Sequence, residues 1–446
     1  MDSMHIYNQM LKETIGKGIY ELSDKQKKAI KLFKSGRNLL ILGEAGCGKS
    51  FLINELTNYL KTKNIKYAIT ALTGIAAFNI NGITINSFTG IGIAKYNKEI
   101  LLKRLRKEYI WNIKCIKVLF IDEISMMSSD LLDKLNYIFQ NVRKNSSFFG
   151  GVQVVFTGDF FQLQPVFNNT DLNTDLLFKN ETFLQEFTLK NIINLDFIFR
   201  QSDLKFKQIL SNIRLGTFTL DDISYLKNNS LKNISDKNSK NFIKLVATNA
   251  QANNINKIEI DSIESDLIEF SMIDTNDKDT MSNDKKFLYN ELISQLTQKQ
   301  LINVKLKIGC KVMLVVNLNV EIGLVNGALG VVVDFDKFSN FPIVEFTNNI
   351  KQTINPYEFK IEWNNVKLSI FQIPLILGYA ITIHKCQSLT LDNIHVDLFN
   401  CFCNAQVYVA LSRVKTLNGL YIKSINPSKI TCCKETLNWY KKNNIL

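Results

Sequence analysis

The chain has 446 residues, too many for one ordinary hydrophobic core, so two or three domains packed together are expected. Hydrophobic residues make up 46% and charged residues 21% of the chain, which is typical of a folded globular protein and excludes a largely disordered one. Lysine and arginine outnumber aspartate and glutamate by 54 to 41, so the net charge of +13 favours a polyanionic partner such as nucleic acid, although an AT-rich genome also enriches lysine.

Other features of the sequence argue against a membrane protein, a secreted protein, and a protein stabilised by zinc or disulfides. The longest apolar runs are strand-sized, far below the roughly 18 residues that suggest a membrane span. The first residues show no signal-peptide pattern, so an intracellular protein is expected. The eight cysteines include no C-x-x-C pair, and the chain has three histidines, so buried free thiols are expected instead of a zinc module or disulfides.

Strand-like and helix-like segments alternate over the first part of the chain. Five strand-like runs, NLLIL, YAIT, VLFI, VQVVFT and EFTL, lie between Asn38 and about Lys190. Because such alternation builds βαβ units, this part is expected to form a parallel sheet covered by helices.

A second group of strand-like runs near residues 242–248, 393–398 and 419–424 predicts another α/β sheet. Residues 304–371 read instead as short strands separated by turns, which predicts a small β-barrel inserted into the second α/β domain. The expected fold class is therefore α/β. The expected boundaries are 1–190 for the first domain, 191–303 with 372–446 for the second, and 304–371 for the insertion.

The segment NLLILGEAGCGKSF contains a complete G-x-x-x-x-G-K-[ST] pattern between a strand and an amphipathic helix. Its glycines let backbone N–H groups curl around phosphate oxygens at a helix N-terminus. Lys49 is expected to reach the β- and γ-phosphates of ATP, and Ser50 is expected to ligate Mg²⁺. The predicted nucleotide-binding residues here are Gly43, Ala45, Gly46, Cys47, Gly48, Lys49, Ser50 and Phe51.

A second motif, KVLFIDEIS, places Asp122 and Glu123 at the carboxyl end of a buried strand, where ligands bind in open α/β sheets. Asp122 suits the magnesium shell, and Glu123 suits the base that polarises the attacking water. An ordinary acidic pair at a strand end is the alternative, but a pair that follows a P-loop favours ATP hydrolysis. The two motifs do not separate kinases, transporters, AAA+ machines and helicases.

Further motifs then follow in a fixed order. TALTGIAAFNINGITINSFTGIG comes after the P-loop, FFGGVQVVFTGDFFQLQPV after the acidic pair, and FRQSD, IHKCQSLTLD and YVALSRV complete the series. With these motifs the chain, from Leu22 to about Ile422, resembles the Pif helicases (petite integration frequency) of superfamily one, group B, and more distantly RecD and Dda. The resemblance implies two RecA-like domains, a small wedge in the first and a barrel like Src-homology-three domains in the second.

The resemblance also implies roles at the ATP site. Gln162 would sense the γ-phosphate, and Arg200 and Arg413 would approach it from the second domain. A guanidinium supplied across a domain interface stabilises transition-state charge and makes hydrolysis depend on closure. Gln26, in LSDKQKKAI, would contact the adenine.

The DNA contacts implied by the resemblance come from the first DNA motif and the fifth motif. The residues are Thr73, Gly74, Asn86, Ser87, Phe88, His384, Lys385 and Gln387. Residues 88–110, which include Lys103, Arg104, Arg106 and Lys107, fit the wedge, although a solvated helix face explains the same basic cluster.

Five positions depart from the family pattern. Cys386 and Ser388 stand where the family's HKSQGLT motif has small residues, and Asn86 stands where a histidine is usual. Gln164 replaces a proline, and Ala405 replaces a glycine. None removes a group that hydrolysis needs.

The resemblance implies an ATP-dependent DNA helicase that moves 5′ to 3′ on single-stranded DNA and unwinds duplexes in replication, repair, recombination or telomere maintenance. Single-stranded and forked DNA would be its partners, with ATP and Mg²⁺ as cofactors and no membrane. A monomer is expected, with a DNA-induced dimer as the alternative. It would act in the nucleus or mitochondrion of a eukaryote, or otherwise in the cytoplasm or at a site of viral replication. A translocase that does not unwind and an inactive nucleic-acid-binding scaffold are the competing hypotheses.

Overall fold

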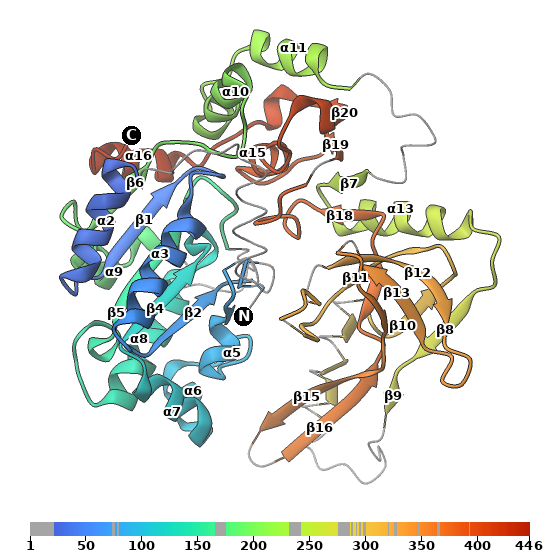
Figure 1. The fold of residues 1–446 in the computed structure, drawn as a ribbon, viewed down its shortest axis with the longest axis horizontal. Coiled ribbons are helices and arrows are strands. Elements are labelled where there is room, and N and C mark those ends of the chain that lie inside the picture. The colour runs from blue at the N-terminus through green and yellow to red at the C-terminus, as the bar shows by residue number, and fades with distance from the viewer. Residues whose placement is uncertain are drawn as a thin grey trace.

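The computed structural model describes most of the chain (Figure 1). The described residues are 22–446 apart from 74–75, 78–79, 166–174, 232–241, 275–285, 287–288, 291, 294–295, 298–299, 320, 325–327, 347, 364–365 and 392. Two α/β units and a β-rich unit are visible in Figure 1, the first α/β unit on the left and the β-rich unit at the lower right. Within the described part, none of the helices combines the length and apolar character needed to cross a membrane.

The first domain is built on a six-stranded parallel sheet with the order β3-β2-β4-β5-β1-β6. Its strands are β1 (Leu39–Gly43), β2 (Tyr67–Ala71), β3 (Ile83–Thr84), β4 (Val118–Asp122), β5 (Gln153–Gly158) and β6 (Ile192–Leu195). Strands β1 and β4 are buried at every position, as expected for apolar runs in a sheet covered on both faces.

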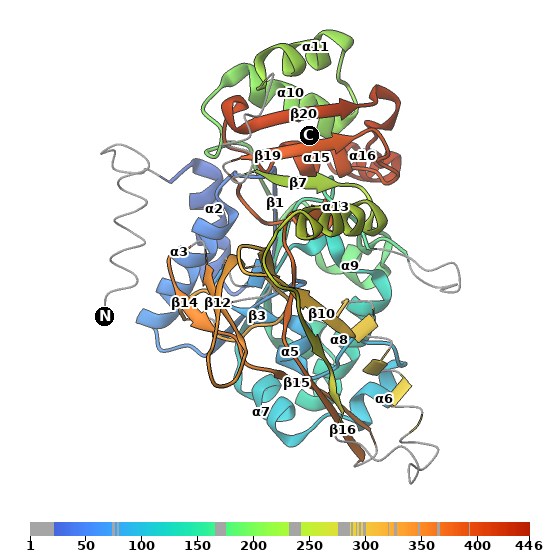
Figure 2. The ribbon, with the colours of Figure 1, turned by 90° about the vertical axis from the view of Figure 1, so that its right-hand side faces the viewer.

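Helices cover both faces of this sheet (Figure 2). They are α2 (Asp24–Lys34), α3 (Lys49–Thr62), α5 (Ile85–Thr89), α6 (Lys98–Lys103), α7 (Lys107–Cys115), α8 (Ser129–Arg143) and α9 (Glu181–Glu186), with 3-10 turns η1 (Ile124–Met126), η2 (Phe148–Gly151) and η3 (Leu177–Lys179). Side chains alternate along β1, so Leu39 and Ile41 pack in the core with α2 and α3, whereas Leu40 and Leu42 pack in the core with α8.

The second domain contains a four-stranded parallel sheet with the order β18-β7-β19-β20. Its strands are β7 (Ile243–Val246), β18 (Ala380–Thr382), β19 (Ile394–Leu398) and β20 (Leu420–Ile425), and its helices are α10 (Leu204–Leu215), α11 (Leu220–Asn229), α13 (Asn249–Asp261) and α15 (Gln406–Leu411), with turns η4 (Leu417–Gly419) and η5 (Pro427–Lys429). Two parallel sheets with flanking helices confirm the expected α/β class.

The insertion is antiparallel, as expected for a unit of short strands and turns. It comprises a five-stranded sheet β14-β13-β12-β11-β17, a three-stranded sheet β15-β16-β9 and a pair β10-β8. The strands are β8 (Ile268–Ser271), β9 (Ile273–Asp274), β10 (Asn303–Leu306), β11 (Lys311–Leu314), β12 (Leu329–Phe335), β13 (Pro342–Phe346), β14 (Lys351–Thr353), β15 (Tyr357–Trp363), β16 (Val366–Gln372) and β17 (Leu375–Leu377). Over the described residues the ladders form these separate sheets, with no single closed ring.

The strand pairing in the structure crosses the expected domain boundaries. Strand β6 pairs with β1, so the first sheet extends past residue 190, and the expected strand EFTL is wrong because α9 runs through Glu186 and the strand begins at Ile192. Strands β8, β9 and β17 pair with strands of the insertion, so the insertion is wider than 304–371.

The last helix, α16 (Lys434–Lys442), also departs from the expected division. The ring of Trp439 lies 5.4 Å from that of Phe160, and the ring of Tyr440 lies 4.7 Å from that of Phe161. These aromatic contacts place the last helix in the core of the first domain, although it follows the second domain in the chain.

Candidate active site between the two domains

The P-loop joins β1 to α3, and two of its positions have backbone conformations that favour glycine. Gly46 and Gly48 have φ angles of 82° and 85°, in the left-handed region. A Cβ atom on Gly46 would lie 2.4 Å from the Cβ of Arg200, so the second domain's chain passes directly over the loop. Helix α3 begins at Lys49 without a side-chain cap, which leaves its first N–H groups pointing into the loop.

Lys49, Ser50 and Phe51 occupy the first turn of α3, as the motif predicts. The ammonium of Lys49 donates hydrogen bonds to the carbonyl oxygens of Gly43 and Glu44, at 2.7 and 2.9 Å. Cys47, a residue of the loop, is buried, and burial raises the pKa of its thiol. The cation therefore already lies within the ring of backbone groups expected to bind phosphates.

The acidic pair lies at the carboxyl end of β4, and its two carboxylates face different neighbours. Asp122 accepts a hydrogen bond from the hydroxyl of Thr157 on β5. Burial, and then the charge of Glu123, raise the pKa of Asp122 to about 6. Glu123 has a left-handed φ of 56°, which turns its carboxylate toward the second domain, where it accepts hydrogen bonds from the Gln387 amide at 3.1 Å and from the Ser388 hydroxyl.

Arg200 and Arg413 lie together in the second domain beside the P-loop. Arg200 donates to the carbonyl oxygen of Ser412 at 3.0 Å, and burial, followed by the charge of Arg413, lowers the pKa of Arg200 to about 10. Arg413 is 1% exposed and donates to the carbonyl oxygens of Val409 at 2.8 Å and Leu389 at 3.3 Å. The structure thus brings both predicted arginines to the domain interface, held by backbone carbonyls of their own domain.

A buried ion pair that the sequence did not predict joins the two domains below the P-loop. Arg214 on α10 donates to both carboxylate oxygens of Asp159, at 3.0 Å from Nε and 2.7 Å from Nη2. One guanidinium nitrogen also lies 3.6 Å from the carboxylate of Glu44 in the P-loop. Burial raises the pKa of Glu44, and the charge of Arg214 opposes that effect. Gln162, three residues after Asp159, is buried, and its amide oxygen has no hydrogen-bond partner among the described residues.

Gln26 and two aromatic side chains border the P-loop at Gly48. Gln26 closes a capping box at the start of α2, where its Oε1 accepts from the Ser23 amide at 3.0 Å. A Cβ atom on Gly48 would lie 3.3 Å from Gln26 Nε2 and 3.3 Å from the ring of Phe199. Phe199 and Phe197 are exposed, with ring centroids 4.6 Å apart. The sequence analysis did not single out either ring, although Phe199 begins the FRQSD motif and Phe197 lies two residues before it.

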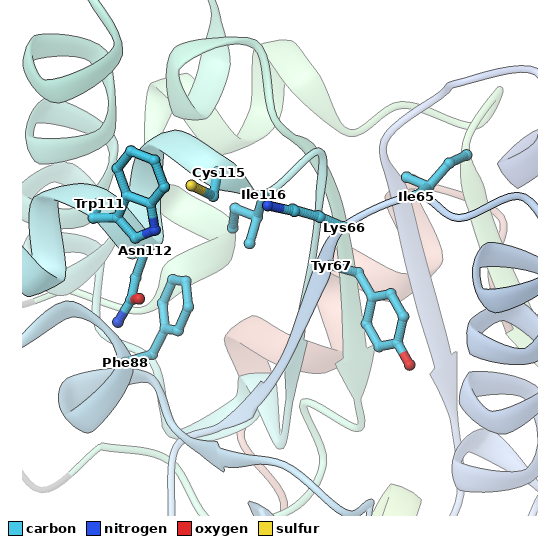
Figure 3. A pocket seen from close by; sticks show the side chains of 8 residues that line it. All are labelled: Ile65, Lys66, Tyr67, Phe88, Trp111, Asn112, Cys115 and Ile116. Carbon is cyan, nitrogen blue, oxygen red and sulfur yellow. The ribbon is translucent and has the colours of Figure 1, made fainter.

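The expected DNA contacts of the first domain lie after the carboxyl ends of β2 and β3. Thr73 lies two residues after β2, where its hydroxyl oxygen accepts from the Ala76 amide at 3.2 Å, and Gly74 lies outside the described residues. Ser87 is exposed, and Asn86 has a buried amide oxygen without a partner among the described residues. Phe88 is only 6% exposed and packs into the core, where it lines a shallow pocket with Trp111 (Figure 3), so direct stacking on DNA is not favoured.

The fifth motif forms a loop, residues 383–389, that has two sides. On one side the ring of His384 stacks on Phe402, with centroids 6.3 Å apart, and Phe402 is 62% exposed. Burial lowers the pKa of His384 and of its neighbour Lys385. On the other side Gln387 is buried, and its amide donates to Glu123, so in this structure its side chain faces the first domain.

The fold and this site define a class, the P-loop nucleoside triphosphatases whose catalytic groups come from two RecA-like domains. Residues 21–224 match the model of the PIF1-like helicases, and residues 291–335 match that of the 2B domain of the DNA helicase Pif1. The crystal structure of Pif1 helicase from Candida albicans is 32% identical and superposes with a TM-score of 0.84, covering 95% of this chain and 100% of that one. The chain belongs to the Pif1 helicase family.

Two further comparisons extend this finding. ATP-dependent DNA helicase PIF1 of Xenopus laevis is 32% identical over 424 residues, which cover 94% of this chain and 64% of that protein. The chain thus spans less than two thirds of the length of that relative. Bacteroides Pif1 bound to ssDNA is 27% identical, with a TM-score of 0.75 and coverage of 95% and 97%.

Proposed function

We propose that this chain is an ATP-dependent DNA helicase that moves 5′ to 3′ along single-stranded DNA and separates duplex DNA ahead of it. One observation carries the proposal. The catalytic base Glu123 of the first domain is hydrogen-bonded by Gln387 and Ser388, in the same second-domain loop that carries His384 and Lys385. Because one side of this loop contacts the catalytic base Glu123 and the other side would face the DNA strand, the loop links hydrolysis to DNA binding.

The P-loop holds the triphosphate of ATP in this proposal. The N–H groups of the loop and the ammonium of Lys49 surround the phosphates, while Gln26 and Phe199 lie beside Gly48 where the base would be bound. The residues fit a magnesium ion, because Asp122 is a buried carboxylate near Lys49 and Ser50 lies at the start of α3. When bound, magnesium neutralises charge on the phosphates.

Hydrolysis then depends on groups from both domains. Glu123 accepts a proton from the attacking water, and the phosphate oxygens take up charge as the bond to the leaving ADP breaks. Gln162 lies buried in the first domain, and Arg200 and Arg413 approach from the second to stabilise the developing charge. Since the second domain supplies the arginines, ATP binding and product release change how tightly the domains pack.

The DNA strand crosses both domains in this proposal. Thr73, Asn86 and Ser87 contact it from the first domain, and His384 and Lys385 contact it from the second. Phe402 adds an exposed ring on which a base can stack, a contact that tolerates every base. The basic net charge of +13 favours the phosphate backbone as well.

The wedge is the pair of short helices α6 and α7, beside the long hairpin of β15 and β16 in Figure 1. Not all of its basic residues are free to meet DNA. Arg104 lies over the ring of Tyr96 at 3.9 Å, and Arg106 lies 3.8 Å from Glu108. We therefore assign duplex separation to the helices' exposed lysines, Lys103 and Lys107, and treat Arg104 as a structural residue.

The cellular role follows from the proposed activity. A helicase of this kind acts on single-stranded and forked DNA during replication, repair, recombination or telomere maintenance. We propose that a monomer is the active unit, and that it works where the DNA of its host or virus is copied.

Steady-state ATP hydrolysis, with and without single-stranded DNA, tests the proposal. The parent should turn over ATP faster when the DNA is present, and Lys49→Ala should lose turnover because the β- and γ-phosphates lose their cation. Lys61→Ala, an exposed lysine on the same helix, is the matched control and should resemble the parent. Hydrolysis that does not respond to DNA, or that survives in Lys49→Ala, would contradict the proposed function.

A further inference from the structure

Ser388 has a backbone conformation that favours glycine, and its hydroxyl contacts the catalytic base of the other domain. Its φ of 70° lies in the left-handed region, which glycine enters freely and a residue with a Cβ atom enters at a cost. The family motif has glycine here. The Ser388 hydroxyl donates to Oε1 of Glu123 in the other domain, and the Gln387 amide donates to Oε2 at 3.1 Å. Both oxygens of the base are thus engaged by one loop of the second domain.

The same loop also reaches an arginine of the site. The carbonyl oxygen of Leu389, the residue after Ser388, accepts from Arg413 at 3.3 Å, and the Leu391 amide donates to the carbonyl oxygen of Arg413 at 3.0 Å. On its other side the loop carries His384, stacked on the exposed Phe402. A movement of residues 383–389 on the strand side would therefore change the partners of both Glu123 and Arg413.

The two hydrogen bonds fix the orientation of the Glu123 carboxylate. With a donor on each oxygen, the carboxylate is held toward the second domain. A base that must turn toward water at the γ-phosphate does so more easily when a donor that restrains it has left.

We propose that Ser388 is a positioning residue that restrains Glu123 in the DNA-free enzyme, and that the strand, by engaging His384 and Lys385, releases this contact and so stimulates hydrolysis. The inference rests on the proposed function. It goes further by assigning the restraint to one hydroxyl group, at a position where this chain departs from the family pattern.

Two variants separate the effect of the Ser388 hydroxyl from that of the backbone, and a third is the control. Ser388→Ala removes the donor and keeps the Cβ atom, whereas Ser388→Gly removes both. Ser424→Ala is the matched control, because the Ser424 hydroxyl also donates to a carboxylate, that of Asp397 at 2.5 Å, at the far strand pair β19–β20. Turnover and KM for ATP are measured for each variant with and without an oligothymidylate.

Ser388→Ala and Ser388→Gly should raise turnover without DNA by about threefold or more, the scale expected for the net free energy of one hydrogen bond. KM for ATP should stay within about twofold of the parent, because the P-loop contacts are intact. The stimulation by DNA should fall by the same factor as the basal rate rises. Ser424→Ala should match the parent.

Each other result overturns the inference. Basal turnover of Ser388→Ala equal to or below that of the parent would show that the hydroxyl does not restrain the base. Activation in Ser388→Gly alone would assign the effect to the backbone. A parent enzyme that hydrolyses ATP without any response to DNA would instead refute the proposed function itself, and the inference with it.

Discussion

Replacing Arg214 by methionine should strongly destabilise the folded chain. Arg214 is 4% exposed, its two hydrogen bonds to Asp159 are 2.7 and 3.0 Å long, and its guanidinium lies over the ring of Phe161 at 4.4 Å. Methionine fills much of the same volume but leaves a fully buried carboxylate without its cation. Removing one partner of a buried pair typically costs about 3–5 kcal/mol, and we expect the free energy of unfolding to fall by that amount.

Urea unfolding followed by tryptophan fluorescence measures this loss, since the buried Trp439 lies in the same aromatic cluster as Tyr440. Arg37→Met, at an exposed arginine, is the control and should stay near the parent. The double variant Arg214→Met with Asp159→Asn should lose less than the single variants added together, because no charge is left buried alone. A loss below about 1 kcal/mol for Arg214→Met, the value of a surface pair, would refute this reasoning.

Three further predictions concern the base, the strand and pH. Glu123→Gln should bind ATP but hydrolyse it about 10² to 10⁴ times more slowly, because an amide cannot accept the proton, and a normal rate would remove Glu123 from this role. Phe402→Ala should weaken single-stranded DNA binding by about 1–3 kcal/mol in fluorescence anisotropy, whereas Phe338→Ala, at a fully exposed ring of the insertion, should not; equal losses would contradict stacking. Burial and two neighbouring lysines lower the pKa of His395 to about 4. The unfolded chain therefore binds the proton first, and the stability from this group, present above about pH 6.5, is lost as pH falls toward 4. The thermal midpoint of His395→Gln should accordingly fall less on acidification than that of the parent. If the two midpoints fall equally with pH, His395 does not contribute to the loss of stability in acid.

The sequence predicts the parts of the site that are formed by short continuous segments of the chain. The P-loop is such a case, because a strand, three glycines and a helix start must follow one another for the backbone to surround a phosphate. Asp122 and Glu123 also follow directly from a buried strand. Strand β6 was misplaced because EFTL and IINL are short runs that lie close together in the sequence, and the pairing with β1 identifies IINL as the strand.

Contacts between distant residues could not be predicted in this way. Arg214 and Asp159 are 55 positions apart, and a single arginine on an amphipathic helix carries no local sign of burial. Gln387 belongs to a motif associated with DNA, yet its amide lies on Glu123, because the loop turns that residue inward. Helix α16 follows the second domain in sequence, and its packing on the first depends on aromatic partners some 280 residues earlier, such as Phe160.

Strand separation on tailed duplexes tests whether the protein is a 5′-to-3′ helicase. We expect ATP-dependent opening of a duplex that carries a 5′ single-stranded tail, and no opening of the same duplex with a 3′ tail. Lys49→Ala should open neither substrate. ATP-driven opening from the 3′ tail, or DNA-stimulated hydrolysis without opening of either duplex, would contradict a 5′-to-3′ helicase, and the second result would favour a translocase that does not unwind.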